Sequence, residues 1–391
     1  MKTLKTAVIG IGNIGSVHAN CIYSGEIKGL NLVAVCDLNS EKLEKFCEKY
    51  SGVETFTDYK QLITSGQLDA VIVSVPHPMH SEIASFALKN GLHVLVEKPI
   101  DIAVSVANKL IQIAEKSNKV FAIMFNQRTN PLFIKAKEIF ESGLLGELKR
   151  TVWVVTNWYR TQHYYDSGNW RATWAGEGGG VLLNQAPHNL DIWQWICGMP
   201  SEVTAFCDVG KYHDVEVEDD ATIVTRYENG AMGTFITSTG ECPGTNRLEI
   251  SGSKGKIIIE NGVLKWWRLK EDERDFCFNS SESFPNVQCD YEEILPEKEE
   301  TAHKGILQNF ANAIIKGETL ISKGSDGIKE LSISNAAYLS SWLGNVPVKL
   351  PFDEEKFDAL LNEHREASAF KNGEVKRKLN TQYSRRWQVN W

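Results

Sequence analysis

The sequence of 391 residues predicts an α/β protein in which a doubly wound, parallel-sheet domain precedes an α+β domain with a large, mainly antiparallel sheet. Two patterns support this prediction. In the first 125 residues, short apolar runs alternate with segments whose apolar residues recur every three or four positions. Later, long alternating strands and the hairpin dipeptides Asn229-Gly230 and Asn261-Gly262 replace that pattern.

The first predicted domain spans residues 1–125. Its strands are short, β-branched runs bounded by Gly or polar residues, at Thr6–Ile9, Leu32–Cys36, Ala70–Val75, His93–Val96 and Val120–Met124. The helices between them are predicted at Ile14–Ser24, Ser40–Tyr50, Ser81–Asn90 and Ala103–Lys116. Because strands alternate with helices, the sheet should be parallel with helices on both faces.

The second predicted domain spans residues 126–350, after a boundary near Met124–Pro131. Its strands are predicted at Leu148–Trp158, Ala221–Tyr227, Ala231–Thr237, Lys256–Ile259 and Val263–Leu269. Its helices are predicted at Pro131–Ser142, Gly180–Cys197, His303–Ile315 and Ile328–Leu343. The acidic segment Asp272–Thr301 is typical of an exposed insertion, and residues 351–391 are typical of a solvated or subunit-packing extension.

The composition argues against several kinds of partner. The chain carries 42 Lys and Arg against 50 Asp and Glu, a net charge of −8, whereas nucleic acids and anionic membranes select basic surfaces. Its eight cysteines form no CxxC pair and no zinc-type cluster, so we expect free thiols and no metal site. Without a signal-type cleavage site or a membrane-length apolar run, the sequence predicts a cytoplasmic protein with no nucleic-acid or membrane partner.

A glycine-rich turn, Gly10-Ile11-Gly12-Asn13-Ile14-Gly15, follows the first predicted strand and opens the first helix. Here Gly10 allows the tight turn, Gly12 lets backbone approach a pyrophosphate, and Gly15 lets the helix pack on the strand. The helix N-terminus, at Asn13 and Ile14, offers its N–H groups to the phosphates. Asp37 follows 22 residues after Gly15, where a carboxylate binds the adenosine ribose and repels a 2′-phosphate. We therefore predict a Rossmann domain that binds NAD, with NADP the poorer cofactor.

Two further segments carry candidate catalytic groups. Glu97-Lys98-Pro99 follows the strand His93–Val96, and ligands of parallel sheets lie beyond the carboxyl ends of the strands, so this triplet is expected beside the cofactor. The run Gly178-Gly179-Gly180 opens a helical segment that continues through Asp191. On a single helix, one face would carry Asn184, His188, Asp191 and Trp195.

Together with the glycine-rich turn, these segments resemble the glucose–fructose oxidoreductase / inositol dehydrogenase family (Gfo/Idh/MocA). The resemblance implies an N-terminal Rossmann domain, a C-terminal domain with an open-faced antiparallel sheet, and an NAD(P)-dependent sugar or polyol dehydrogenase. Because the family usually covers its open sheet with a partner subunit, the resemblance also implies a homo-oligomer.

The resemblance assigns roles to matching positions. Lys98 would be the catalytic lysine, bonded to the reacting hydroxyl, and His188 the acid/base histidine. Glu97 and Pro99, the latter after a cis bond, would shape the cofactor pocket. Other positions expected near the cofactor or the substrate are Pro76, His80, Asn126, Arg128 and Arg171, whereas Asp191 is expected to be structural rather than catalytic.

Elementary chemistry agrees with the two catalytic roles. Oxidation of an alcohol removes a hydride from carbon and a proton from oxygen. Burial beside a positively charged nicotinamide should lower the pKa of Lys98 towards the working range. We expect His188 to titrate near neutrality and to accept the proton or pass it on.

Position 184 departs from the family pattern, which commonly has Asp four residues before the histidine. Asn184 can hydrogen-bond a sugar hydroxyl but cannot relay a proton, which leaves proton transfer to Lys98 and His188. The run Asn-Gln-Ala-Pro-His is similar to a branch that includes glycoside 3-dehydrogenases.

Aromatic side chains crowd the stretch from Trp153 to Trp174. Such rings stack on the C–H faces of sugars, and Tyr, His and Arg supply hydroxyl partners, although about half of these rings are expected to pack the core or an interface instead. The predicted substrate contacts are Lys98, Arg128, Trp158, His163, Tyr164, Arg171, Asn184 and His188.

The sequence thus predicts an NAD-dependent dehydrogenase that oxidises a secondary ring hydroxyl of a small carbohydrate, with C3 of a glucoside or C-glucoside preferred. An inositol or other polyol is the alternative substrate. Two alternative functions are a lyase or hydrolase that uses bound NAD without net NADH, and a non-catalytic sugar sensor.

Overall fold

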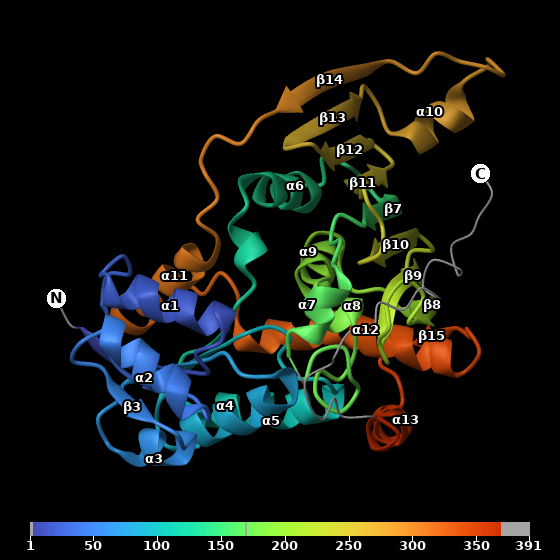
Figure 1. Ribbon diagram of the computed structural model, residues 1–391. Helices are drawn as coiled ribbons and strands as arrows, with labels where there is room; N and C mark the ends of the chain where they lie inside the picture. The colour runs from blue at the N-terminus through green and yellow to red at the C-terminus, as the bar shows by residue number, and fades with distance from the viewer. Residues whose placement is uncertain (1–2, 169, 369–391) are drawn as a thin grey trace.

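The structure, a computed structural model, describes residues 3–168 and 170–368. Figure 1 shows two parts, with the first sheet and its helices in blue and the second sheet extending away from them in green to gold. The chain enters the second part after β6 and later returns to the first through α11.

The first sheet of the described chain is a six-stranded parallel sheet with the order β3-β2-β1-β4-β5-β6. Its strands are β1 (Leu4–Ile9), β2 (Leu30–Cys36), β3 (Glu54–Phe56), β4 (Ala70–Val73), β5 (His93–Val96) and β6 (Phe121–Ile123). Its helices are α1 (Asn13–Tyr23), α2 (Ser40–Lys49), α3 (Tyr59–Thr64), α4 (His80–Lys89) and α5 (Val104–Ser117), with the short turn η1 (His77–Met79). This strand order is that of a Rossmann domain, as the sequence predicted.

Strand β3 and helix α3 were not predicted from the sequence. Glu54–Phe56 is three residues long and two of these are exposed, so it has no apolar run, and Tyr59–Thr64 is too short for helical periodicity. Both lie at the edge of the domain, and the order of the remaining strands does not depend on them.

The second sheet of the described chain has nine strands in the order β14-β13-β12-β11-β7-β10-β9-β8-β15. Its strands are β7 (Leu148–Val155), β8 (Glu202–Val209), β9 (Glu218–Arg226), β10 (Met232–Ser238), β11 (Asn246–Gly252), β12 (Gly255–Glu260), β13 (Val263–Leu269), β14 (Cys289–Ile294) and β15 (Val348–Lys349). All neighbours pair antiparallel except β7 and β10. This arrangement is the predicted, mainly antiparallel sheet.

One face of this sheet carries the core. Trp153 and Phe235 are fully buried on it, whereas Val152, Val154 and Ile236, which point to the other face, are only half-buried. The helices that follow β6 along the chain are α6 (Pro131–Glu141), α7 (Gln162–Asp166), α8 (Val181–Asn184), α9 (Pro187–Cys197), α10 (Glu273–Asn279), α11 (Ala302–Lys316), α12 (Gly327–Trp342) and α13 (Glu354–Glu366), with the turns η2 (Asn126–Thr129) and η3 (Gly324–Asp326).

Helix α11 belongs by packing to the first sheet. Its residues Ile306, Leu307 and Phe310 are buried in one cluster with Leu4 and Val8 of β1, and Figure 1 shows α11 beside α1. The predicted second domain, residues 126–350, therefore contributes a helix that covers the Rossmann sheet.

The acidic segment is exposed, as predicted, but it is not without structure. Helix α10 has no buried residue, and β14 pairs with β13 as an edge strand of the large sheet. Beyond β15, Phe357 of α13 stacks on Trp342, so the predicted extension begins with a packed helix. The rest of the predicted extension, which in the sequence carries basic clusters at 376–378 and 385–386, lies outside the described residues.

Candidate active site

A cavity of about 530 Å³ lies where the carboxyl ends of the parallel strands face the second part of the chain. Residues of both parts line it. From the Rossmann domain it takes Gly10, Gly12, Asn13, Ile14, Asp37, Pro76, His80, Glu97 and Lys98, and from the second part Tyr164, Arg171, Asn184 and His188. These predicted site residues come from segments far apart in the sequence and converge on one space.

The glycines at the cofactor end of this cavity differ in what they tolerate. Gly10 has φ +87°, and a Cβ there would lie 2.4 Å from the carbonyl oxygen of Ser74. A Cβ on Gly15 would lie 1.8 Å from the carbonyl oxygen of Gly10, whereas one on Gly12 would meet no atom of the described chain within 4 Å. Gly10 and Gly15 are thus required by packing, and Gly12 keeps space open in the cavity.

Helix α1 begins at Asn13 without a side-chain cap and without an acidic residue in its first turn. Asn13 and Ile14 line the cavity beside Gly12. Uncapped N–H groups and the partial positive charge of a helix N-terminus suit a pyrophosphate. These residues therefore fit the phosphates of a dinucleotide.

Asp37 lines the cavity at the end of β2. Its carboxylate accepts hydrogen bonds from the backbone N–H groups of Ile11 (3.1 Å) and Asn39 (3.0 Å), which fix its position. A carboxylate has further lone pairs for the hydroxyls of a ribose. Lys42, which was not among the predicted cofactor contacts, also lines the cavity, with its Nζ 3.9 Å from Oδ2 of Asp37.

The triplet after β5 is fixed from several sides. The Lys98-Pro99 bond is cis, and Nδ1 of His80 lies 2.6 Å from the carbonyl oxygen of Pro99. Glu97 is buried, and its Oε1 lies 2.7 Å from Nε2 of His18. Burial alone would raise the pKa of Glu97, but the interactions with His18, Lys98 and His303 outweigh it and lower the pKa to about 2. The glutamate is therefore ionised next to Lys98.

Lys98 reaches across to the second part of the chain. Its Nζ donates a hydrogen bond of 2.5 Å to the backbone carbonyl oxygen of Asn184. Burial lowers the pKa of the Lys98 amine, against the opposing charges of Glu97, Glu330 and Glu177. The direction of this shift agrees with the expectation for a lysine that accepts a proton.

The single helix predicted over Gly180–Cys197 is wrong. Helix α8 ends at Asn184 and α9 begins at Pro187, because proline lacks the N–H that an unbroken helix would need and fits the first helical position. Asn184 and His188 therefore lie on different helices, and both line the cavity.

The glycine run before α8 is required by close packing. A Cβ on Gly180 would lie 1.9 Å from the carbonyl oxygen of Glu218. The buried carboxylate of Glu218 accepts hydrogen bonds from the N–H groups of Gly180 (2.9 Å) and Leu182 (2.8 Å), and burial raises its pKa to about 7. Glu218 thus holds the start of α8 in place. Because Glu218 lies far from α8 in sequence, no local pattern predicted this contact.

His188 differs from the sequence-based expectation in its titration. Desolvation, followed by the charge of Lys98, lowers the pKa of His188 to about 3, so the ring is neutral at neutral pH. Its Nδ1 is buried and has no hydrogen-bond partner among the described residues. A neutral imidazole is an acceptor at one nitrogen and a donor at the other.

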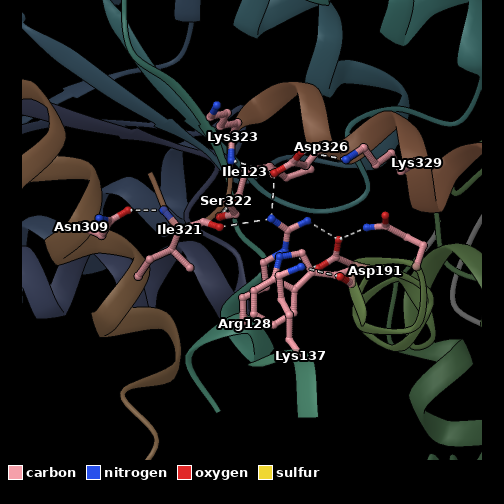
Figure 2. Close-up of polar contacts among 12 residues, drawn as sticks. Ile123, Arg128, Lys137, Asp191, Asn309, Ile321, Ser322, Lys323, Asp326 and Lys329 are labelled. Carbon is pink, nitrogen blue, oxygen red and sulfur yellow. Dashed lines mark hydrogen bonds and ion pairs between the residues drawn. The ribbon is translucent and has the colours of Figure 1, made fainter. Parts of the chain in front are cut away.

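The position of Arg128 corrects the predicted substrate contact. Figure 2 shows its guanidinium between Asp191 and Asp326. Nε and Nη2 donate to the Asp191 carboxylate at 2.8 and 2.7 Å, and Nη1 donates to Asp326 at 2.7 Å and to the Ile321 carbonyl at 3.1 Å. Arg128 is 3% exposed and does not line the cavity, so it ties η2 to α9 and η3.

Other predicted positions lie away from the cavity lining. Trp158 donates from Nε1 to Asn189 at 3.3 Å, and His163 is exposed on α7. Asn126 has a buried Oδ1 without a partner in the described part of the chain. The positions in the Rossmann domain that do not line the cavity, Gly15 and Pro99, adjoin residues that do. Trp158 and His163 are therefore not in the lining that contains Lys98.

The cavity lining also includes residues that were not among the predicted cofactor or substrate contacts. These are His77, Trp170, which belongs to the aromatic stretch, and His303. Burial lowers the pKa of His77 and of His303. Glu177 is 1% exposed and hydrogen-bonded to Asn184. The position of Glu177 directly before the Gly178 run was a sequence signal that could have placed it near the site. His303 reaches the cavity from α11, and no motif near it in the sequence indicated this position.

Within residues 3–168 and 170–368, no group of His, Cys, Asp and Glu side chains has the arrangement of a metal site. The eight cysteines are all free. Among the described helices, none combines the length and the apolar character that crossing a bilayer requires.

Two family profiles match the chain. The profile described as "oxidoreductase family, NAD-binding Rossmann fold" matches residues 4–125, and that of the GFO/IDH/MocA C-terminal domain matches residues 133–258. Among curated relatives, myo-inositol 2-dehydrogenase of Thermotoga maritima is 29% identical over 343 residues, covering 85% of this chain and 95% of its own. The NAD⁺-dependent scyllo-inositol 2-dehydrogenase of Bacillus subtilis is 24% identical, covering 89% and 96%.

Solved structures have the same fold. The WlbA dehydrogenase of Bordetella pertussis, solved with NADH and UDP-GlcNAcA, superposes with a TM-score of 0.76 at 23% identity, over 90% of this chain and 99% of its own. A levoglucosan dehydrogenase in complex with NADH and levoglucosan superposes with a TM-score of 0.74 at 20% identity, over 90% and 100%.

Proposed function

The chain belongs to the Gfo/Idh/MocA family of NAD-dependent oxidoreductases, and from this premise we propose that its cavity oxidises a secondary ring hydroxyl of a sugar or cyclic polyol. The observation that carries the proposal is the meeting of Lys98 and His188 in the cavity that begins at the glycine-rich turn. Their retention argues against a non-catalytic sugar sensor.

The proposed roles follow from the chemistry of each group. NAD, when bound, supplies the hydride acceptor. Lys98 binds the reacting hydroxyl and takes its proton, which its lowered pKa favours. The hydrogen bond from Nζ of Lys98 to the backbone carbonyl of Asn184 directs Nζ towards the cavity residues that the second part of the chain contributes.

We propose that His188 binds the same hydroxyl through its neutral ring, because an imidazole with a pKa of about 3 does not hold a proton at neutral pH. We also propose that Asp37 favours NAD over NADP, because a carboxylate at this place repels a 2′-phosphate. The neighbouring Lys42 weakens this repulsion without removing it.

For the substrate we propose C3 of a glucoside or C-glucoside as the oxidised position. The support is Asn184 in the place where the family commonly has Asp, together with the aromatic and polar lining formed by Tyr164, Trp170 and Arg171. Arg171 lies over the rings of Tyr164 and Trp170, 4.6 and 4.4 Å from their centroids.

An inositol is the second candidate, favoured by the 29% identity to a myo-inositol 2-dehydrogenase over most of both chains. The two candidates share the same chemistry at the reacting carbon. They differ in whether the ring carries an oxygen and an aglycone, and substrate assays can therefore separate them.

The test is NADH formation by the purified protein with glucosides, C-glucosides, levoglucosan and inositols, each repeated with NADP. A rise with a glucoside that is absent with its 3-deoxy analogue supports C3 oxidation. A rise with inositols alone moves the assignment to the polyol. Release of an aglycone without net NADH would instead indicate a redox-assisted lyase or hydrolase.

We further propose that the chain is a cytoplasmic homo-oligomer. The half-buried outer face of the nine-stranded sheet supports association, and eight unpaired cysteines suit a reducing compartment. Light scattering on the full chain and fractionation of cells that express it test the two statements separately.

A further inference from the structure

The side chain of Glu177 accepts hydrogen bonds only. It is buried to 1% exposure, and its Oε2 accepts from the backbone N–H of Ala172 at 2.6 Å, while Oε1 accepts from the Asn184 side-chain amide. A carboxylate has no hydrogen to give. The NH₂ group of Asn184 faces Oε1 of Glu177, and its Oδ1 points the other way, towards the hydroxyl of Tyr164.

The groups on the other side of Asn184 agree with this orientation. The hydroxyl of Tyr164 lies 3.4 Å from Oδ1 of Asn184. That hydroxyl accepts hydrogen bonds from Nη1 of Arg171 (2.9 Å) and from Nε2 of Gln185 (3.2 Å). With both lone pairs engaged, the Tyr164 hydroxyl directs its own hydrogen to Asn184.

The same amide oxygen has room for a second hydrogen. Its contact with Tyr164 is long, and an amide oxygen has two lone pairs. Asn184 lines the cavity, and its backbone carbonyl holds Nζ of Lys98 at 2.5 Å. A hydroxyl next to the one that Lys98 binds would thus lie near this oxygen.

We propose that Glu177 is a positioning residue that fixes the Asn184 amide with its oxygen towards the cavity, so that Asn184 selects substrates with a hydrogen-donating hydroxyl next to the oxidised carbon. This inference rests on the proposed function and specifies how that site would recognise vicinal hydroxyls of a sugar or cyclic polyol.

The inference also explains why position 184 carries an amide. An aspartate there would bring two carboxylates into contact in a buried site, where they cannot both be ionised. Glu177 and Asn184 are therefore a matched pair of acceptor and donor. Exchanging the two groups, by Glu177→Gln together with Asn184→Asp, would keep one amide against one carboxylate and would again present an acceptor to the cavity.

A double-mutant cycle tests the pairing through stability. Asn184→Asp should lower the thermal midpoint at neutral pH by about 2–4 °C, and the double variant Glu177→Gln/Asn184→Asp should recover most of this loss. Equal destabilisation by Asn184→Asp in the wild-type and in the Glu177→Gln background would overturn the pairing. This measurement needs no substrate, so it gives a result even if the proposed function fails.

Kinetics test the selection. Glu177→Gln lets the amide of Asn184 turn its NH₂ to the cavity, so KM for the sugar should rise about tenfold with kcat less affected. Preference over the deoxy analogues that lack a hydroxyl next to the oxidised carbon should fall by the same factor, and the double variant should restore it. Unchanged discrimination in Glu177→Gln would overturn the inference.

The chain offers a matched control in Glu300, which accepts a hydrogen bond of 3.0 Å from Asn130 and does not line the cavity. Glu300→Gln removes the same kind of amide–carboxylate contact and should leave KM and discrimination unchanged. A wild-type enzyme that oxidises no sugar or polyol would contradict the proposed function, and the stability cycle would still decide the pairing.

Discussion

The two ends of the cavity are built in different ways. The cofactor end consists of one local segment, the turn from Gly10 to Gly15, and of Asp37 at the next strand end. The catalytic end joins Lys98 of the first sheet to Asn184 and His188, which lie on two short helices of the second part. The cofactor end is formed mainly by backbone atoms, whereas the catalytic end is formed mainly by buried side chains from distant segments.

This difference affects how each end responds to substitution. A backbone-built site fails when its shape changes, whereas a side-chain site fails when one charge or proton carrier is lost. At the catalytic end, burial lowers the pKa of both Lys98 and His188, because desolvation disfavours the charged form of each group. The contrast can be tested by comparing variants of the two ends.

The largest effect is expected at Lys98. Lys98→Ala removes the proposed proton acceptor and should lower kcat by at least about a hundredfold, since acid–base groups contribute at this level. NADH binding, followed by its fluorescence, should survive because the cofactor end is built elsewhere. An active Lys98→Ala variant would contradict the proposed mechanism.

His188→Gln should lower kcat on the order of tenfold, a smaller loss because Lys98 still takes the proton. The profile of kcat/KM against pH should keep a limb that rises with pH and reports Lys98, whose pKa lies below its ordinary value. If the limb vanishes in this variant, the titrating group is His188 and the two roles must be exchanged.

Gly12→Ala tests the shape of the cofactor end. A Cβ at this position meets no described protein atom within 4 Å, so thermal stability should stay close to wild type. Because the methyl group occupies space that a pyrophosphate needs, KM for NAD should rise about tenfold while sugar discrimination is unchanged. A loss of stability instead would show that the turn, not the cavity, requires this glycine.

A somewhat smaller change is expected at Asp37. Asp37→Ser removes the charge that repels a 2′-phosphate and leaves Lys42 to attract it, so the NAD-to-NADP ratio of kcat/KM should fall by several-fold. Adding Lys42→Gln should remove the gain with NADP. An unchanged ratio in Asp37→Ser would place the selectivity elsewhere.

The remaining prediction concerns stability in acid rather than catalysis. The ring of His188 stays neutral when folded down to pH about 3, but in the unfolded chain it takes up a proton below about 6.5. Its contribution to stability is therefore full above pH 6.5 and is lost as the pH falls towards 3, by about 1.4 kcal/mol per pH unit. Urea unfolding between pH 7 and 5 should show a shallower pH dependence in His188→Gln than in wild type.

Much of the cofactor end could be predicted because it depends on neighbours in sequence. The positive φ of Gly10 and the close approach of Gly15 to the Gly10 carbonyl are both features of one local strand–turn–helix, although Gly10 also packs on distant Ser74. The alternation of strands and helices likewise indicated the Rossmann order. The hairpins at Asn229-Gly230 and Asn261-Gly262 were likewise local.

The errors have physical reasons of another kind. Pro187 was a local signal against one helix over Gly180–Cys197, and the helical periodicity on both sides of it concealed the break. Arg128 resembled a substrate contact until Asp191 and Asp326, 63 and 198 residues away, proved to hold its guanidinium. Glu218 of β9 binds the start of α8, and His303 of α11 lines the cavity. Both lie far in sequence from the recognised motifs, so no local pattern predicted their positions.

The sequence by itself determined the two kinds of sheet, the dinucleotide turn and the identity of the reactive side chains, because these depend on local spacing and residue chemistry. Only the tertiary structure decided which of those side chains share a cavity, that His188 is neutral, and that Glu177 contacts Asn184. Desolvation and long-range hydrogen bonds arise from packing between distant segments, and no local pattern records them.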